Sequence, residues 1–252
     1  MIKRSEDIIF NEDKSINEKA LISCLKEHKE SIARFTTLKD LYDGKHAILE
    51  RSKTQTDLAN NKLMINHAEY ITDFATAYFM GNPIKYTFPE EENRTDDDSL
   101  LQAFRKANIT QVDTELARDL SIFGIGIEYV YQDKEGNTKS TNLDPRTAFI
   151  VVDDTVEENT LIGVHRIKKR NENNKEIGEI LKVITDDTVY TYEFKNDKLS
   201  LINEELNVFN EVPMIEYWNK VNQKGDFESV ISLINAYNLL QSDRVNDKEQ
   251  YV

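Results

Sequence analysis

The sequence predicts an α+β protein in which N-terminal helices precede a largely antiparallel β meander, and a long helix follows at the C-terminus. Changes of hydrophobic period support this class. Apolar residues recur at helical spacing as far as Gly124, alternate with polar residues from Ile125, and return to helical spacing after Gly225. Most connections between the expected strands are too short for the crossovers that parallel pairing needs, which favours antiparallel pairing.

Two long helices are expected in the first third of the chain, after a polar arm at residues 1–14. Ser15-Ile16-Asn17-Glu18 has the form of a capping box, and apolar residues follow at helical spacing until Gly44. The residues of this first stripe are Leu21, Leu25, Ile32, Phe35 and Leu38. A second stripe ends at Gly81 and Pro83, which are typical helix stops. Its residues are Met64, His67, Ile71, Phe74 and Tyr78.

An acidic segment separates these helices from two shorter ones. Residues 90–98 contain six carboxylates, which we interpret as a solvated loop, because no rigid spacing typical of a metal site accompanies them. Leu100, Leu101 and Phe104 then begin a short helix. Thr110-Gln111-Val112-Asp113 resembles another cap, and the helical period continues from Val112 to Phe123.

From Ile125 the pattern predicts a series of short strands joined by turns. The expected strands are Ile125–Tyr131, Lys139–Leu143, Ala148–Val152, Leu161–Lys169, Glu179–Thr185, Val189–Phe194, Leu199–Asn203 and Pro213–Trp218. A last helical pattern runs through Val230, Ile231, Ile234, Tyr237, Leu240 and Val245 without a stop signal, so we expect this helix to continue beyond Val252. The resulting division is a flexible arm at 1–14, an α+β domain at 15–225 and an incomplete helix at 226–252.

Composition excludes several functional classes. The formal charge is −14, with 32 Lys and Arg against 46 Asp and Glu, which disfavours a nucleic-acid binder with a basic field. A hydrophobic fraction of 39% predicts a folded, soluble protein rather than an acidic disordered chain. The single cysteine, Cys24, fits a reducing compartment, and no apolar run approaches the roughly 18 residues that would span a membrane.

The sequence identifies no catalytic, cofactor-binding or metal site. Gly124-Ile125-Gly126 lies between a helix and a strand, the reverse of a dinucleotide-binding fingerprint, and indicates a helix end with a packed strand start. His28, His46, His67 and His165 lack the spacing of zinc ligands. We interpret His67 and His165 as structural histidines, and Cys24 has no evident basic partner that would activate its thiol.

Two carboxylate pairs, Asp153-Asp154 and Asp186-Asp187, could in principle hold two metal ions for phosphodiester hydrolysis. Adjacent strand residues point to opposite faces, however, and both pairs fall at predicted turns, so we interpret them as turn caps.

Several short strings resemble the N-terminal part of the portal proteins of long-tailed bacteriophages, a head-to-tail connector family of Gram-positive hosts. These strings, in the family's order, are Tyr42-Asp43-Gly44-Lys45-His46-Ala47-Ile48 with Arg51, Asn60–Leu63, Asn66–Phe74, Tyr78–Ile84, Gly124–Tyr131, Leu143-Asp144-Pro145, Asn210–Pro213, Gly225–Val230, Asn235–Asn238 and Ser242–Asp247. Their shared order within one chain makes the match specific. The resemblance covers nearly all of the chain from about Tyr42 onward.

This resemblance implies a structural subunit of a homo-oligomeric ring, usually of about twelve copies, at one capsid vertex of the virion. It implies assembly in the host cytoplasm, no catalysis and no cofactor. The implied partners are other copies of the chain, capsid, scaffolding, terminase and head-completion proteins, and double-stranded DNA that passes non-specifically, with no membrane. Residues 1–225 would correspond to most of the wing region and 226–252 to the start of a stem helix, since family members continue further and this chain would be truncated.

A ring through which DNA passes needs a low affinity for DNA, and the acidic charge of the chain fits this need. The apolar stripe of the last helix could pack on neighbouring subunits rather than on its own domain. Two alternatives remain open. The chain could be a metal-dependent hydrolase or nuclease that uses Asp153 or Asp186, or a monomeric acidic module that binds basic proteins.

Overall fold

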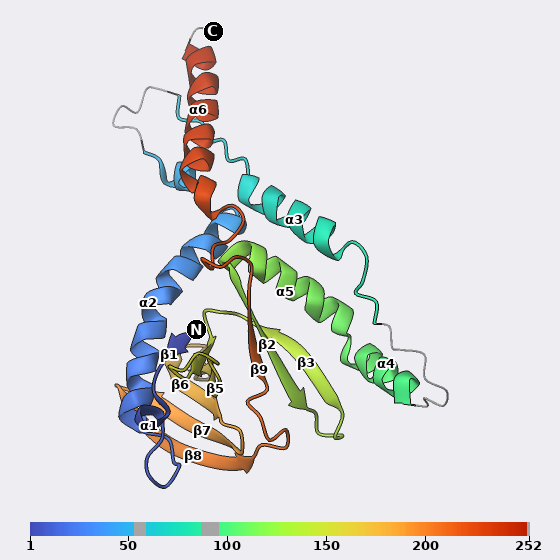
Figure 1. The fold of residues 1–252 in the computed structure, drawn as a ribbon. Helices are drawn as coiled ribbons and strands as arrows, with labels where there is room; N and C mark the ends of the chain where they lie inside the picture. Colours follow the sequence, from blue (N-terminus) through green and yellow to red (C-terminus); the bar gives the residue numbers. More distant parts are fainter. Residues whose placement is uncertain (53–58, 87–95, 251–252) are drawn as a thin grey trace. The chain divides into compact units, whose positions relative to one another are not determined.

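A computed structural model describes residues 1–52, 59–86 and 96–250 of the chain (Figure 1). The helices are α1 (Glu6–Ile9), α2 (Glu18–Tyr42), η1 (Ala47–Glu50), α3 (His67–Met80), α4 (Asp96–Ala107), α5 (Ile109–Phe123), η2 (Glu228–Val230) and α6 (Ile231–Gln250), of which η1 and η2 are 3-10 helices. The strands are β1 (Ile2–Lys3), β2 (Ile125–Gln132), β3 (Thr138–Leu143), β4 (Ala148–Val152), β5 (Thr160–Arg170), β6 (Glu176–Ile184), β7 (Thr188–Lys195), β8 (Lys198–Leu206) and β9 (Met214–Trp218). The predicted α+β class and the order of helices, meander and C-terminal helix are confirmed.

The chain folds as two compact units. Unit 1 contains residues Met1–Ala33, Tyr86–Val112 and Gly126–Tyr217, and unit 2 contains Arg34–Lys85, Asp113–Ile125 and Trp218–Val252. This partition differs from the contiguous ranges expected from the sequence, because both units are built from three separated segments of the chain.

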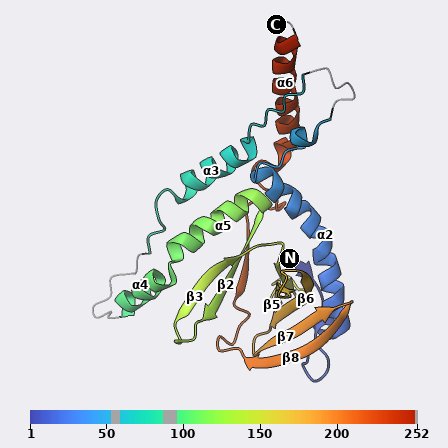
Figure 2. The same ribbon diagram turned by 180° about the vertical axis from the view of Figure 1, so that it is seen from behind.

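Unit 1 is built on two sheets. The six-stranded sheet has the order β1-β4-β5-β6-β7-β8 and the three-stranded sheet the order β3-β2-β9. The consecutive strands β4 to β8 pair in antiparallel fashion, as their short connections predict, whereas β1 pairs with β4 in parallel. Figure 2 shows β8 at one edge of the larger sheet.

The strand β4 is buried on both faces because it separates two cores of unit 1. Phe149 and Val151 point into a core that includes β5, β6, α1 and the first half of α2. Ala148, Ile150 and Val152 point into a second core shared with β2, β3 and β9. Period-two alternation thus supplies both cores from one strand.

Residues 1–14, for which the sequence predicts a flexible arm, contribute strand β1 and helix α1 to unit 1. Ile2 pairs with Val151 in the sheet, and Ile2 and Ile9 are buried in the first core. The sequence does not indicate these two elements, because the segment carries only short apolar stretches, which become strand β1 and the single helical turn α1 through tertiary contacts rather than through local periodicity.

The helix starts also differ from the predicted caps. Asn17, not Ser15, caps α2, since its Oδ1 accepts hydrogen bonds from the amides of Lys19 (3.1 Å) and Ala20 (3.4 Å). Ser15 instead donates its hydroxyl to Asp13 at 2.5 Å. Thr110 lies inside α5, which begins at Ile109, directly after Asn108 with its φ of +53°. Of the acidic run, residues 90–95 lie outside the described residues and Asp96 begins α4.

Unit 2 has a core of its own formed by the end of α2, α3, the end of α5 and the start of α6. Its buried residues are Phe35, Leu38, Leu41, Ala68, Ile122, Phe123, Ile125, Phe227 and Ile234. The rings of Phe35 and Phe123 meet edge to face at 5.7 Å, which is the favoured arrangement for aromatic pairs.

Candidate functional site

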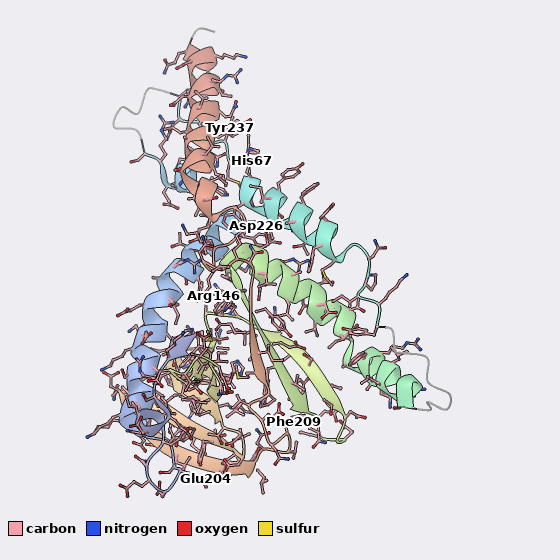
Figure 3. The ribbon with its side chains drawn as sticks, viewed as in Figure 1. His67, Arg146, Glu204, Phe209, Asp226 and Tyr237 are labelled. Atoms are coloured by element: carbon pink, nitrogen blue, oxygen red, sulfur yellow. The ribbon has the colours of Figure 1, made fainter. Side chains whose placement is uncertain are left out.

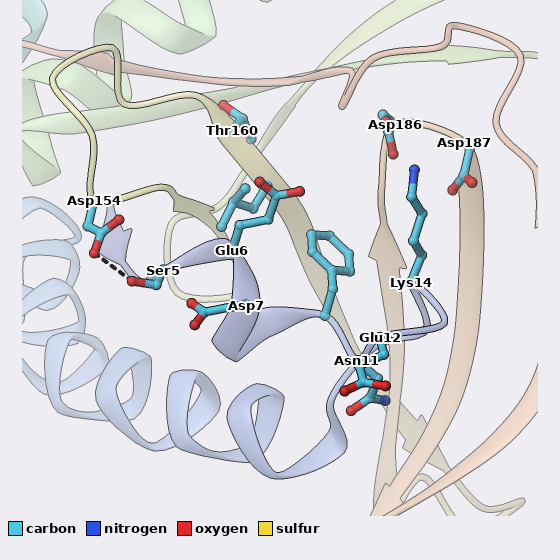
Figure 4. Close-up of a pocket in the computed structure, with 12 residues that line it drawn as sticks. Ser5, Glu6, Asp7, Asn11, Glu12, Lys14, Asp154, Thr160, Asp186 and Asp187 are labelled. Carbon is cyan, nitrogen blue, oxygen red and sulfur yellow. Dashed lines mark hydrogen bonds between the residues drawn. The ribbon is translucent and has the colours of Figure 1, made fainter.

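Three of the four carboxylates in the two predicted pairs line the same pocket of unit 1. Asp154, Asp186 and Asp187 line one pocket, where Ser5 donates its hydroxyl to Asp154 at 2.6 Å and Lys14 points toward Asp186 (Figure 4). No group of three His, Cys, Asp or Glu among the described residues could hold a metal ion.

Local hydrogen bonds account for one member of each pair, Asp153 and Asp187. Asp153 accepts from the amide and hydroxyl of Thr155, and Asp187 accepts from the hydroxyl of Thr185 at 2.8 Å. These bonds lower the pKa of both carboxyls, as expected for anions that receive donors. Asp153 and Asp187 therefore cap turns, as predicted.

The structure does not bring His67, His165 and Cys24 together into a catalytic arrangement. The ring of His67 packs on Tyr237 with centroids 5.0 Å apart (Figure 3), and burial, followed by the charge of Lys182, lowers the pKa of His165. Cys24 is fully buried, and this burial raises the pKa of its thiol. A thiol with a raised pKa is a weak nucleophile, which leaves Cys24 a core residue.

His28 and His46, for which the sequence predicts no role, lie in buried polar networks. Nε2 of His28 contacts the carbonyl of Pro145 at 2.9 Å in unit 1. In unit 2, Nε2 of His46 contacts Oδ1 of Asn66 at 3.1 Å, and its Nδ1 contacts Nδ2 of Asn238 at 3.2 Å. Neither network has a sequence signature, because each joins residues far apart in the chain.

The Gly-x-Gly string marks a tightly packed junction in unit 2, consistent with the predicted helix end and strand start. Gly124 has φ +81°, and a Cβ there would lie 2.1 Å from the carbonyl oxygen of Gln223. Arg34 braces the same junction: its guanidinium pairs with both carboxylate oxygens of Glu228 and donates to the carbonyl of Gln223 at 2.7 Å. The requirement for glycine is therefore steric.

Helix α6 binds an extended segment through polar rather than apolar side chains. Asn238, Ser242 and Asn246 are fully or almost fully buried, whereas Leu240 of the expected apolar stripe is exposed. Their side chains accept hydrogen bonds from three alternate backbone amides, those of Ile65 (3.0 Å), Leu63 (2.9 Å) and Asn61 (2.7 Å) respectively.

We call these three hydrogen bonds the α6 ladder. The geometry of helices and extended chains explains their spacing. Four residues of a helix rise about 6 Å, and two residues of an extended chain rise about 6.6 Å. Polar residues repeated every four positions along α6 can therefore meet every second amide of a straight segment. The face of α6 that carries the ladder is used inside unit 2, so the interpretation of α6 as a simple apolar stripe is incomplete.

Replacing Asn238 by Leu should lower the free energy of unfolding by about 2 kcal/mol, because the amide of Ile65 and the ring of buried His46 both lose a partner. Gln241→Leu, a change on the same helix outside the ladder, should alter stability by less than about 0.5 kcal/mol. Urea denaturation measures both values. Equal losses in the two variants would show that the ladder adds no stability.

The face that α3 presents to its own unit matches the predicted stripe only in part: Ile71 packs against the core, but Phe74 and Tyr78 do not. The buried residues are Ala68, Thr72 and Thr76, whereas Tyr70, Phe74 and Tyr78 are 67%, 65% and 86% exposed. The Oγ1 atoms of Thr72 and Thr76 are buried and have no hydrogen-bond partner among the described residues. Helix α3 thus buries hydroxyl groups and exposes aromatic rings to solvent. Both arrangements are energetically unfavourable when no partner covers the helix.

Thr72→Val should raise the free energy of unfolding by about 1 kcal/mol, because it removes an unpartnered buried hydroxyl and keeps the shape of the side chain. Thr185→Val is the matched control. The hydroxyl of buried Thr185 bonds to Asp187 and Thr188, and its loss should cost about 2 kcal/mol. Opposite signs in thermal or urea denaturation are expected, and destabilisation by Thr72→Val would contradict the inference.

Comparison with protein families decides the affiliation of the chain. Residues 22–252 match the family described as phage portal protein, SPP1 Gp6-like. The chain belongs to the phage portal protein family. The matched region begins within α2, about twenty residues before Tyr42, where the resemblance of the short strings begins. It includes parts of both units of the portal chain. No curated protein matches this portal chain.

Portal proteins are generally structural, so the surfaces of the chain matter more for such a role than a catalytic pocket does. In the part of the portal chain that the structure describes, no helix is long and apolar enough to cross a membrane. Two features of unit 2 have no counterpart in the sequence pattern: the buried polar ladder of α6 and the exposed rings of α3, of which the second is a departure from an ordinary surface.

Proposed function

We propose that the chain is a subunit of a homo-oligomeric ring at one capsid vertex, through which DNA enters during packaging and leaves during ejection. The observation that carries this proposal is the family match over residues 22–252. By the same affiliation, the proposed function is structural rather than enzymatic, the proposed location is the virion after assembly in the host cytoplasm, and the proposed ring has about twelve copies.

The charge of the chain supports a conduit that does not grip DNA. A net charge of −14 opposes the accumulation of phosphate contacts that makes DNA binding tight and salt-dependent. On α6, Asp243, Asp247 and Glu249 outnumber Arg244 and Lys248. Non-specific, weak contact with double-stranded DNA is therefore part of the proposal, together with capsid, scaffolding, terminase and head-completion proteins as partners.

The division of labour along the chain is also a proposal. Residues 15–225 would form most of a wing-like region and residues 226–252 the beginning of a stem-like helix. Helix α6 fits this role because a ladder of polar side chains fixes it to residues 61–65 on one side and leaves apolar residues such as Leu233 and Leu240 exposed on another.

Native mass spectrometry and negative-stain electron microscopy of the purified 252-residue chain test this function. We expect closed rings with a central hole, and no hydrolysis of DNA in the presence of Mg²⁺ or Mn²⁺. A chain that stays monomeric at every concentration and salt would favour the monomeric interaction module instead. Metal-dependent DNA cleavage abolished by Asp153→Asn or Asp186→Asn would favour the hydrolase.

A further inference from the structure

The exposed rings of α3 form a surface that unit 2 leaves without a partner among the described residues. We call Tyr70, Phe74 and Tyr78 the α3 face. These residues follow one another at a spacing of four, so they share one side of the helix, opposite the buried Ala68, Thr72 and Thr76. The rings of Tyr70 and Phe74 stack on each other with centroids 6.5 Å apart.

The chemistry of the α3 face excludes polyanionic partners. Helix α3 contains Glu69 and Asp73 and no Lys or Arg, whereas binding of nucleic acid or of an anionic membrane surface depends on basic side chains. Aromatic residues at this density, with few charges among them, are typical of the buried centre of a protein interface.

The distribution of charge within the chain identifies the protein that can meet this face. Unit 2 carries 12 Lys and Arg against 14 Asp and Glu, a net charge of −2, which leaves −12 of the total of −14 to unit 1. Two copies that met through unit 1 would bring two strongly acidic surfaces together. Two copies that meet through unit 2 avoid most of this repulsion.

The size of the face is consistent with a subunit contact. At about 200 Å² per aromatic side chain, the exposed fractions of the three rings amount to roughly 440 Å². A stable interface buries about 800 Å² per partner, so the α3 face would provide more than half of it. Leu233, Tyr237 and Leu240, also exposed on α6, extend the apolar surface, and His67 joins the two helices through its ring contact with Tyr237.

We infer that the α3 face is one of the two surfaces through which consecutive copies of this chain contact each other. This inference rests on the proposed ring and adds the site of contact. The contact is heterologous, as a ring requires: the α3 face of one copy meets a different surface of the next.

Phe74→Ser and Tyr78→Ser test the inference against two controls at exposed apolar residues of unit 1, Val156→Ser and Leu206→Ser. Sedimentation velocity over a concentration series gives the concentration at which half of the chain is assembled. We expect the α3 variants to raise this concentration about tenfold or more, and the unit 1 variants to leave it unchanged. Circular dichroism should show the same helix content in all four variants and the original chain.

A photoreactive phenylalanine analogue in place of Tyr78 provides a second measurement that keeps an aromatic ring at this position. Irradiation should produce covalent dimers, and mass spectrometry should map the link to a second copy. If the chain assembles but the α3 variants assemble equally well, or no link to a second copy forms, the inference is wrong and the proposed ring stands. If the original chain never assembles, the proposed ring itself fails.

Discussion

Gly124→Ala should destabilise unit 2 by about 4 kcal/mol or more, a large part of the stability of a typical domain. Two costs add at this position. The backbone has φ +81°, which an alanine adopts at a cost of about 1 kcal/mol, and the new Cβ would lie 2.1 Å from the carbonyl oxygen and 2.4 Å from the carbonyl carbon of Gln223. Both atoms belong to the backbone, so a rotamer change cannot relieve the clash.

Gly136→Ala separates these two costs. Gly136 has almost the same φ, +80°, but the nearest atom to a Cβ there is Nε2 of Gln132, at 3.9 Å. This variant should lose about 1 kcal/mol, from backbone strain alone. Guanidinium denaturation of both variants gives the comparison. Losses of equal size would show that the junction between the end of α5 and the segment at Gln223 can open without cost.

The strand region of the fold was predictable because local signals and tertiary structure agree there. The predicted strand Ala148–Val152 matches β4 at both ends, and the other predicted strands lie within a few residues of the observed ones. Alternation of apolar residues survives in the fold because β4 and its neighbours are covered on one or both faces. Short connections then leave antiparallel pairing as the natural outcome.

The helices of unit 2 show where periodicity fails as a guide to burial. A stripe of large apolar residues on α3 predicts a helix, and α3 is present, but Phe74 and Tyr78 are exposed while Thr72 and Thr76 are buried. On α6, the buried positions are mostly polar, because Asn238 and Ser242 bind backbone amides rather than a core. Periodicity locates a face of a helix, and the partner of that face decides whether it is buried in the monomer.

The candidate surfaces were not predictable from residue types for the same reason. Catalytic and metal sites use His, Cys, Asp and Glu at characteristic spacings, and their absence from the sequence pattern left family resemblance as the guide to function. The α3 face consists of ordinary aromatic residues, two of which, Phe74 and Tyr78, belong to the apolar stripe that predicts the helix. Its exposure is visible only when the three segments of unit 2 are assembled around Ala68.

His28 gives unit 1 a dependence on pH that a surface histidine would not give. Its ring is 4% exposed and packs 4.6 Å from the ring of Phe149, Nε2 donates to the carbonyl of Pro145, and Nδ1 lies 3.4 Å from Arg166. Burial, and then the charge of Arg166, lower the pKa of His28 to about 4. Glu179 holds Arg166 in place through a bidentate ion pair, so the cation remains beside the ring.

Acidification from pH 6.5 to pH 4 should therefore remove about 3 kcal/mol of stability through His28 alone. The unfolded chain binds a proton near pH 6.5 and the folded chain near pH 4, so the contribution is complete above pH 6.5 and decreases as the pH falls toward 4. Urea denaturation of the original chain and of His28→Gln across this range isolates the effect from that of the carboxylates. We expect the original chain to lose about 3 kcal/mol more than the variant, with His165→Gln as a comparison at a second histidine of lowered pKa. Parallel curves for the original chain and His28→Gln would mean that the buried ring can take up a proton without disturbing the contacts of Pro145 and Arg166.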